Sequence, residues 1–512
     1  MTGSSATLRS LVIYALVLPL ALLLGYLLAQ PLDLWTMMFY GMVAGILAFP
    51  LLIKWHRPML FMAWNMTAVV FLLPGRPQLW FVMAFLSLLI SIVQRTILRE
   101  MRFLHVPSLV LPLLFIALIV YLTGKVRGGF GLASFGGETI GGRRYWTAFA
   151  GIAGFLAMIA QRIPPQKAML YVGLFFLAPI LNSVGNTIDF VAPSFYWIFL
   201  IFPVEYLPGQ GPSMIARFYG LTLAGMGVYY YLLARHGVGG ILGARNLRRG
   251  LLLFGALALT MTGGYRSFFI LMVMTFLFVF YYEGLLRSRY TVMLLLATIL
   301  GAAIIVPLAT KLPLSIQRTL SILPIEVDYR ARESAQGSSE WRLKMWETLL
   351  PEIPEYFWFG KGLAIEGREL VMVNEQAQGD SAAGAERAKL AGDYHNGPLT
   401  VLIPFGIWGA LGWLWFLAAG FRALYLNYRY GDESLKTINT FLLAYFLARV
   451  IHYMLIFGNF YSDIAIFAGI VGLGVSLNGG ICQPARAPAR ARQPVNPPMR
   501  AARPAWASPR SV

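Results

Sequence analysis

The chain of 512 residues is 58% hydrophobic and only 12% charged, and its mean hydropathy is +0.66. This composition leaves too little polar surface for a water-soluble globule of that length, so it excludes that class of protein. The formal net charge is +19. Apolar runs that approach the ~20 residues needed to cross a bilayer recur along the chain, which indicates a polytopic helical membrane protein.

About fourteen apolar segments qualify as spans, and the first lacks a small-residue cleavage site, so it is expected to be retained as a span. We therefore expect an all-α transmembrane bundle of about 12–14 spans. The expected spans are residues 10–29, 34–53, 59–73, 79–93, 107–122, 147–160, 168–181, 214–233, 251–261, 268–282, 291–308, 399–421, 438–455 and 464–477. The aromatic stretch 189–206, broken by Pro193 and Pro203, is expected to lie at the membrane interface or to re-enter the membrane.

Lysine and arginine are distributed unequally between the loops, and this inequality predicts the orientation. The basic segments all fall on one side under this span count, which is cytoplasmic by the positive-inside rule. They are residues 54–57, 95–102, 161–167, 235–249, 287–289 and 422–436. Both termini are expected on this side of the membrane. The tail from Gly479 carries arginines but no acidic residue, and we expect it to be disordered near anionic lipid.

The polar segment 307–396 is predicted to be a large periplasmic loop. It holds 13 of the 22 acidic residues and 10 of the 41 basic ones, so its net charge is −3 while the rest of the chain is +22. The positive total is thus explained by orientation in the membrane, and nothing else supports nucleic-acid binding. We divide the chain into N-terminal transmembrane helices (1–306), this loop (307–396), C-terminal transmembrane helices (397–478) and a basic cytoplasmic tail (479–512).

Within the loop, Ser338-Ser339-Glu340 offers a helix start. Apolar residues then repeat at helical spacing, which predicts an amphipathic helix lying on the membrane or on the bundle. These residues are Leu343, Trp346, Leu349 and Leu350. Pro351 and Pro354 are expected to end the helix, and Gly360-Lys361-Gly362 to form a turn. Residues 366–392, which have few apolar anchors, are expected to form a mobile flap over a site.

His395-Asn396 follows this loop, at the point where the chain re-enters the membrane. Of the five histidines, only His395 falls in an outer-side loop, where a side chain that exchanges protons near neutral pH can act on a substrate. Gly406 and Gly409 allow other elements to approach the next helix closely. An equally simple interpretation makes His395 a polar residue at a helix start.

Three arginines share the outer side with this histidine. Arg217 lies at the start of one span, Arg266 lies between two spans, and Arg342 lies in the loop helix. A guanidinium keeps its charge and offers a planar fork of donors that matches phosphate oxygens, so converging arginines suit a diphosphate better than a carboxylate. Each arginine alone is also explained as an interfacial anchor. The pair Arg143-Arg144 is assigned to topology only.

These motifs together resemble the O-antigen ligase and polymerase superfamily. Ser339-Glu340-Trp341-Arg342-Leu343-Lys344-Met345-Trp346, with Pro354 and Gly360-Lys361-Gly362 downstream, is similar to the arginine–tryptophan loop helix of the family. His395-Asn396, nine residues and Gly406-Ile407-Trp408-Gly409 resemble its histidine motif, and Thr262-Gly263-Gly264-Tyr265-Arg266 its span-end arginine turn, with Tyr265 where Ser is usual. Arg217 with Gly220 resembles an earlier arginine–glycine element. The similarity covers about residues 214–477.

The resemblance implies glycosyl transfer on the periplasmic face from a glycan linked to undecaprenyl diphosphate. Arg217, Arg266 and Arg342 would then compensate the charge of the leaving diphosphate, with Arg266, Arg342 and His395 as the catalytic set. His395 would orient or deprotonate the acceptor hydroxyl, or help to hold the diphosphate. Asn396, Gly406, Gly409 and Trp346 would support the site. No cofactor is expected, and without any Asp-x-Asp pair we expect a metal-independent reaction.

The sequence does not decide which acceptor receives the glycan. A ligase transfers the glycan to lipid A-core, whereas an O-antigen or exopolysaccharide polymerase transfers it to another lipid-linked repeat, and both break the same bond. A flippase for the same lipid-linked glycan is a third alternative. That alternative predicts charged residues and broken helices near the midplane, with repeats in the two halves, and the sequence contains no visible repeat.

Overall fold

A computed structural model of the chain describes residues 14–15, 17–23, 25–26, 34–73, 75–97, 103–130, 142–204, 206–207, 215, 217–243, 246–364, 389 and 392–484. Nine of the twenty residues of the first expected span (10–29), nearly all of the expected flap 366–392, and the tail from residue 485 onward lie outside the described residues.

Helices make up nearly all of the regular structure in these residues, which confirms the expected all-α class. The helices are α2 (Leu34–Ala63), α3 (Leu79–Ile97), α4 (Pro107–Arg127), α5 (Gly142–Met158), α6 (Ala168–Leu177), α7 (Ser183–Val191), α8 (Tyr219–Leu242), α9 (Leu247–Met261), α10 (Arg266–Tyr282), α11 (Arg289–Leu308), α12 (Leu314–Leu320), α13 (Tyr329–Leu349), α14 (Ile353–Tyr356), α17 (Leu399–Tyr430), α18 (Lys436–Leu455) and α19 (Phe460–Asn478). Two short strands, β1 (Tyr206–Leu207) and β2 (Arg217–Phe218), pair antiparallel.

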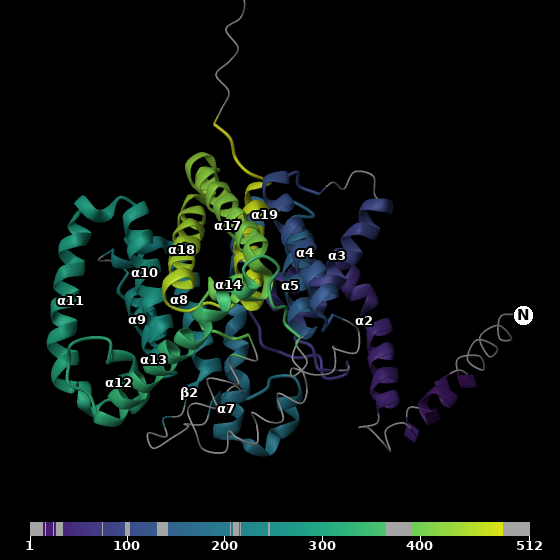
Figure 1. The fold of residues 1–512 in the computed structure, drawn as a ribbon, viewed down its shortest axis with the longest axis horizontal. Coiled ribbons are helices and arrows are strands. Elements are labelled where there is room, and N and C mark those ends of the chain that lie inside the picture. The colour runs from purple at the N-terminus through teal and green to yellow at the C-terminus, as the bar shows by residue number, and fades with distance from the viewer. Residues whose placement is uncertain are drawn as a thin grey trace, which may run out of the picture.

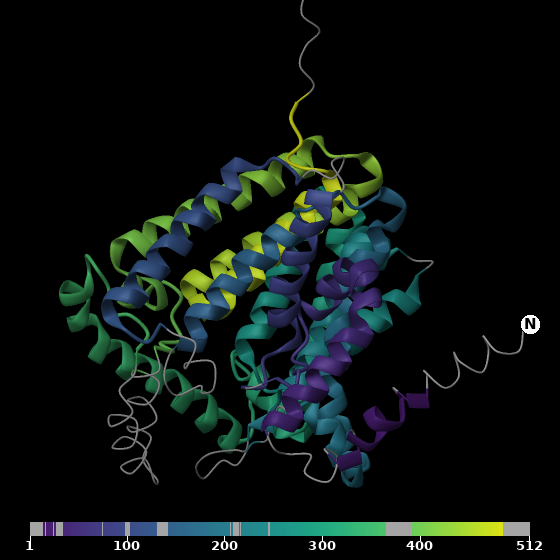
Figure 2. The same cartoon turned by 90° about the vertical axis from the view of Figure 1, so that its right-hand side faces the viewer.

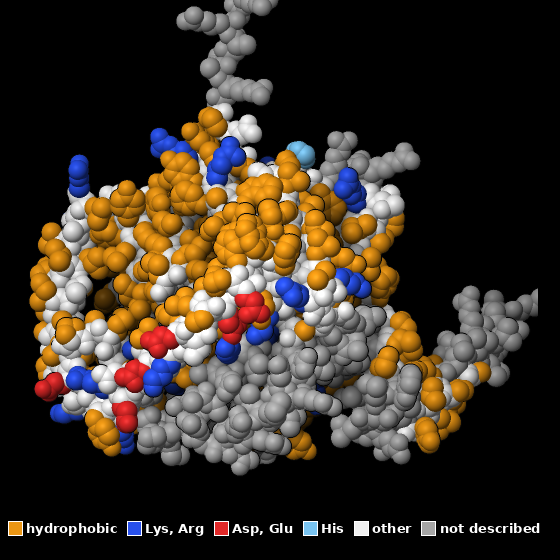
Figure 3. Space-filling view, viewed as in Figure 1, with side chains coloured by type: hydrophobic (Ala, Val, Ile, Leu, Met, Phe, Trp, Pro, Cys, Tyr) orange, Lys and Arg blue, Asp and Glu red, His pale blue; other side chains and the backbone are white. Residues whose placement is uncertain are grey.

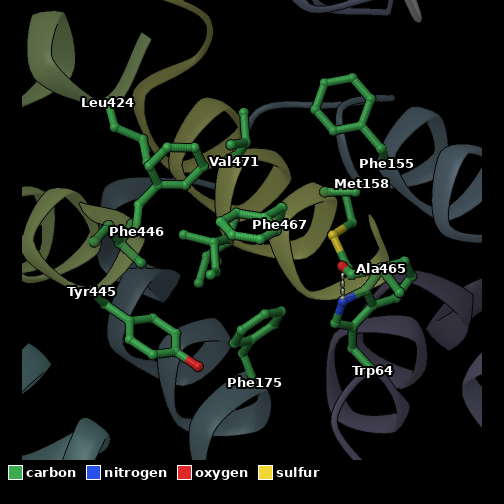
Figure 4. Packing of buried hydrophobic residues seen from close by; sticks show 14 of the residues in the cluster. Trp64, Phe155, Met158, Phe175, Leu424, Tyr445, Phe446, Ala465, Phe467 and Val471 are labelled. Carbon is green, nitrogen blue, oxygen red and sulfur yellow. Dashed lines mark hydrogen bonds between the residues drawn. The ribbon is translucent and has the colours of Figure 1, made fainter. Parts of the chain in front are cut away.

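The centre of the bundle is the contact of α19 with α5, and α4 lies along α17 beside it (Figures 1 and 2). Small residues let large side chains enter this contact. A Cβ on Gly154 would lie 2.1 Å from the Trp64 ring, and one on Gly469 would lie 2.1 Å from its Nε1. The indole therefore fits between two helices and donates a 3.0 Å hydrogen bond to the Ala465 carbonyl (Figure 4).

The basic loops that we expect to be cytoplasmic gather at one end of the bundle, where the chain leaves α19 (Figure 1). Arg235 and Ser434 line the same cavity at this end, the Tyr428 hydroxyl donates to the Tyr282 carbonyl, and Gly479 packs on Arg162. Helices α12, α13 and α14 lie toward the opposite end, where Figure 3 shows acidic and basic side chains below a broad apolar surface. This arrangement is that of a multi-pass membrane protein.

Eight helices among the described residues are long and apolar enough to cross a bilayer. Helices α5, α8, α9 and α10 belong to the same bundle but fall outside that criterion. Helix α11 stands apart at one side of the bundle, with none of its residues buried (Figure 1). Residues 183–200 form α7 and a short 3-10 helix (Pro193–Leu200), with Phe190 and Tyr196 exposed, instead of a separate span.

One part of the span prediction is wrong. The expected spans 34–53 and 59–73 are replaced by the continuous helix α2, so the basic segment 54–57 lies within a helix. Its polar groups are satisfied there, since His56 bonds the Ser87 hydroxyl and Arg57 bonds the carbonyl of Gln161 at 2.5 Å. His56 is therefore buried in the bundle and is not the loop residue that we expected.

The loop helix α13 also differs from the prediction. It begins at Tyr329, about ten residues before the expected start, because the Asp328 side chain accepts from the Arg330 N–H and caps it. Of the apolar face that we expected, Leu349 is buried, whereas Leu343 and Leu350 are exposed. The buried positions are Ala331, Ala335, Met345 and Leu349, and they hold α13 against the end of the bundle.

Candidate active site

Helix α17, which follows the candidate histidine, is broken near its start. Gly406 has φ +65°, which side chains with a Cβ rarely adopt, and Pro404 two residues earlier has no N–H. The Ile407 N–H leaves the helix pattern and donates to the Phe357 carbonyl at 2.6 Å. The break thus leaves backbone N–H and carbonyl groups of α17 free to form hydrogen bonds with a second segment of the chain.

The glycine turn 360–362 is that second segment. The Lys361 N–H donates to the Ile403 carbonyl at 2.8 Å, and the Gly362 N–H donates to the Pro404 carbonyl at 2.9 Å. A Cβ on Gly360 would lie 2.2 Å from the Pro404 oxygen. The two glycine motifs, distant in sequence, therefore form one joint. Gly409 lies in the next turn of α17, where a Cβ would lie 2.4 Å from the Cβ of Phe405.

His395 lies just before α17 in a strained conformation, with φ +49°. Its ring lies between two aromatic rings, with centroids 5.1 Å from Trp341 and 5.0 Å from Phe457. The next residue, Asn396, precedes α17, and its side-chain oxygen accepts from the Leu399 N–H at 3.1 Å. The backbone and the two rings together fix where the imidazole points.

Asp393 is the carboxylate beside this histidine. Its Oδ1 lies 3.6 Å from His395 Nδ1 and accepts a 2.9 Å hydrogen bond from the Asn459 amide. Burial lowers the pKa of His395 and the nearby Arg342 lowers it further, while Asp393 raises it; the net shift is downward. The imidazole is therefore neutral at pH 7 and able to accept a proton. The Trp346 indole donates to the Tyr394 carbonyl at 2.9 Å and ties this segment to α13.

The three arginines predicted from the sequence come from different elements, and Arg342 is the one whose charge acts on His395. Arg266, at the start of α10, donates to the Ala335 carbonyl at 2.6 Å and to the Ser339 hydroxyl at 3.0 Å, both on α13. Arg342 lies over the Phe457 ring at 5.6 Å, and its buried Nε has no hydrogen-bond partner. Arg217, on β2, lies 6.0 Å from the centroid of the Tyr265 ring.

A fourth arginine, Arg318 on α12, completes the cluster. It is only 3% exposed and donates to the Gly264 carbonyl and to the Ser334 hydroxyl. Burial lowers the pKa of Arg318, and the positive charges of Arg217, Arg266 and Arg342 lower it further. The four guanidiniums therefore lie within electrostatic range of one another, so the cluster is strongly positive.

The sequence analysis missed Arg318, Asp393 and Phe457. Asp393 stands two residues before His395, and that proximity was a usable sign. Arg318 had none, because an arginine in a polar loop resembles any other until its partners are known. Arg144, which we had assigned to topology, lies 5.2 Å from the centroid of the Tyr461 ring, and Gly392 packs against its Nη1.

In the part of the chain that the structure describes, no three His, Cys, Asp or Glu side chains come together in a way that could hold a metal ion. The polar side chains of the site are instead arginines with one carboxylate and one histidine. Such a set binds anions and moves protons.

The fold and this site define a multi-pass membrane protein with a cluster of arginines beside a histidine and a carboxylate. The O-antigen ligase family model matches residues 250–414, a segment that contains Arg266, Arg318, Arg342 and His395. This part of the chain is therefore a domain of the O-antigen ligase type, and the resemblance inferred from the motifs is confirmed. No curated protein matches the chain.

Proposed function

We propose that the protein is a membrane glycosyltransferase that moves a glycan from a polyprenyl diphosphate, undecaprenyl diphosphate in bacteria, to a hydroxyl acceptor. The observation that carries this proposal is the cluster of Arg217, Arg266, Arg318 and Arg342 next to His395. A transferase of this kind needs fixed positive charge where the diphosphate leaves and a base where the acceptor loses its proton.

In the proposed reaction, the acceptor oxygen attacks the anomeric carbon of the glycan, and the bond from that carbon to the diphosphate oxygen breaks. The diphosphate leaves with the bonding electrons, and the arginines stabilise its added negative charge. The acceptor proton passes to Nε2 of His395, the ring nitrogen not directed at Asp393, and the negative charge of Asp393 stabilises the imidazolium. The products are the glycosylated acceptor and the free polyprenyl diphosphate.

The acceptor that we propose is lipid A-core, as the ligase description of the matched family suggests. We place the reaction on the periplasmic face of the inner membrane, since the cluster lies at the end of the bundle opposite the basic loops. A polymerase that uses a second lipid-linked repeat as acceptor employs the same bond cleavage. The two functions differ in which acceptor is consumed.

The test is conversion of undecaprenyl-diphosphate glycan by the full chain in proteoliposomes with EDTA present. Each acceptor, lipid A-core or a second lipid-linked repeat, is supplied separately. We expect product with lipid A-core, and we expect His395→Ala to lower turnover by about 10²–10⁴-fold, the usual effect of losing a positioned proton-transfer group. Arg330→Ala is the matched control, because that exposed arginine bonds only the nearby Asp328.

Product with the second repeat alone would make the protein a polymerase. Near wild-type turnover in His395→Ala would reduce that residue to a helix-start role. Loss of activity on chelation would contradict the metal-independent reaction.

A further inference from the structure

Arg318 and Arg266 both connect the turn between α9 and α10 to helix α13. Arg318 reaches the carbonyl of Gly264, in the turn between α9 and α10, and bonds Ser334 on α13 at 3.1 Å through its Nε. Arg266, two residues after Gly264, bonds Ala335 and Ser339 on that same helix. The spacing between the arginine of α10 and the arginine of α13 is thus fixed by Arg266 directly and by Arg318, which bonds both the turn before α10 and α13.

Among the described residues, the cluster also carries more positive charge than its surroundings balance. Among the ionisable groups that act on Arg318, three are arginines and the fourth is the neutral Tyr265. Asp393 is the carboxylate that acts on Arg342. Buried charges are normally paired with an opposite charge, so this group of guanidiniums is complete only with a ligand that carries several negative charges.

We propose that Arg318 is the positioning residue of this cluster, and that its clamp and charge make the site select a diphosphate over a monophosphate. The inference rests on the proposed function and deepens it. A diphosphate carries negative charge on the oxygens of two phosphate groups, so it can bind guanidiniums from α10 and α13 together. A monophosphate engages one side only. Discrimination therefore depends on the spacing between those helices, which Arg318 holds.

The experiment compares affinities for inorganic diphosphate and inorganic phosphate in the full chain in detergent without divalent metal, by calorimetry and by ligand-induced thermal shift. We expect Arg318→Lys to weaken diphosphate binding by about tenfold or more, because an ammonium cannot bond both Gly264 and Ser334 in the fork geometry. The preference for diphosphate over phosphate should fall with it. Arg330→Ala, on the exposed side of α13, should bind both anions as the wild type does.

A role in folding alone would lower thermal stability and leave that preference unchanged, and this result would overturn the inference. If Arg318→Lys does not fold, Ser334→Ala decides, since it keeps the charge and removes one bond of the clamp. An unchanged preference in folded Ser334→Ala would then overturn the inference while leaving the proposed function intact. If the wild type itself binds no diphosphate, the diphosphate recognition in the proposed function fails as well.

Discussion

Asp393 controls the protonation of His395, and this control predicts a measurable change in pH dependence. Burial and Arg342 lower the pKa of His395, whereas the Asp393 carboxylate raises it. In the proposed reaction the neutral imidazole is the base, so we expect activity to be lost as the pH falls through this lowered pKa. Asp393→Asn removes the influence that raises the pKa. We expect the acidic limb of kcat/KM to move to lower pH and the maximal rate to fall, because the imidazolium is stabilised less.

The measurement is kcat/KM against pH for the wild type, Asp393→Asn and, as a control, Asp328→Asn. Asp328 is a helix-capping carboxylate far from the histidine in sequence and bonded to Arg330, so its variant should keep the wild-type limb. An acidic limb in Asp393→Asn that stays in place or moves to higher pH would contradict the proposed pairing.

At the scale of the element, the joint between the broken helix α17 and the glycine turn 360–362 predicts a large effect of one methyl group. Gly406→Ala forces a Cβ to within 2.6 Å of the Trp358 carbonyl oxygen at φ +65°. We expect it to destabilise the fold by about 1–3 kcal/mol or more, the usual range for such backbone strain. Gly301→Ala in α11 is the control, because a Cβ there meets nothing within 4 Å. Equal thermal stability of the two variants would show that the joint is not needed.

Most helices of the bundle were predictable because each apolar run buries a face or meets lipid, and hydropathy records that directly. One error arose where a polar group finds a distant partner, and the other where two helix-start signals compete. Arg57 stays inside α2 because it donates a hydrogen bond to the Gln161 carbonyl. Helix α13 starts early because Asp328 caps it, although Ser338-Ser339 also fits a helix start. Neither the continuity of α2 nor the start of α13 can be read from the local residue types alone.

The candidate site was predictable only for residues that stand in recognisable sequence motifs. Arg266, Arg342 and His395 were found because each stands in a recognisable context at a predicted span end. Arg318 was not found, because its meaning depends on the carbonyl of Gly264 and the hydroxyl of Ser334, both far along the chain. The joint of α17 with the turn was likewise hidden, since backbone hydrogen bonds between distant segments leave no pattern in side-chain types.

The whole molecule is polar at both ends and apolar between them, and the two ends differ in kind. One end collects basic loops, and the other carries α12, α13 and α14 with the acidic side chains (Figure 3). The site is assembled at the second end from β2, the turn before α10, α12, α13 and the start of α17. Helix α12 contacts both α13 and α10, and α14 contacts α17, and these contacts bring the segments together.

This asymmetry predicts the sidedness of the protein in the membrane. Basic loops are retained in the cytoplasm, so the site end should face the periplasm. In a Cys482→Ala background, which removes the only cysteine, single cysteines are introduced at the exposed positions Lys344 on α13 and Ser434 in the basic end. A membrane-impermeant maleimide should label Lys344→Cys in intact spheroplasts and Ser434→Cys only after lysis. Labelling of Ser434→Cys alone in intact spheroplasts would place the arginine cluster in the cytoplasm and contradict the periplasmic reaction that we propose.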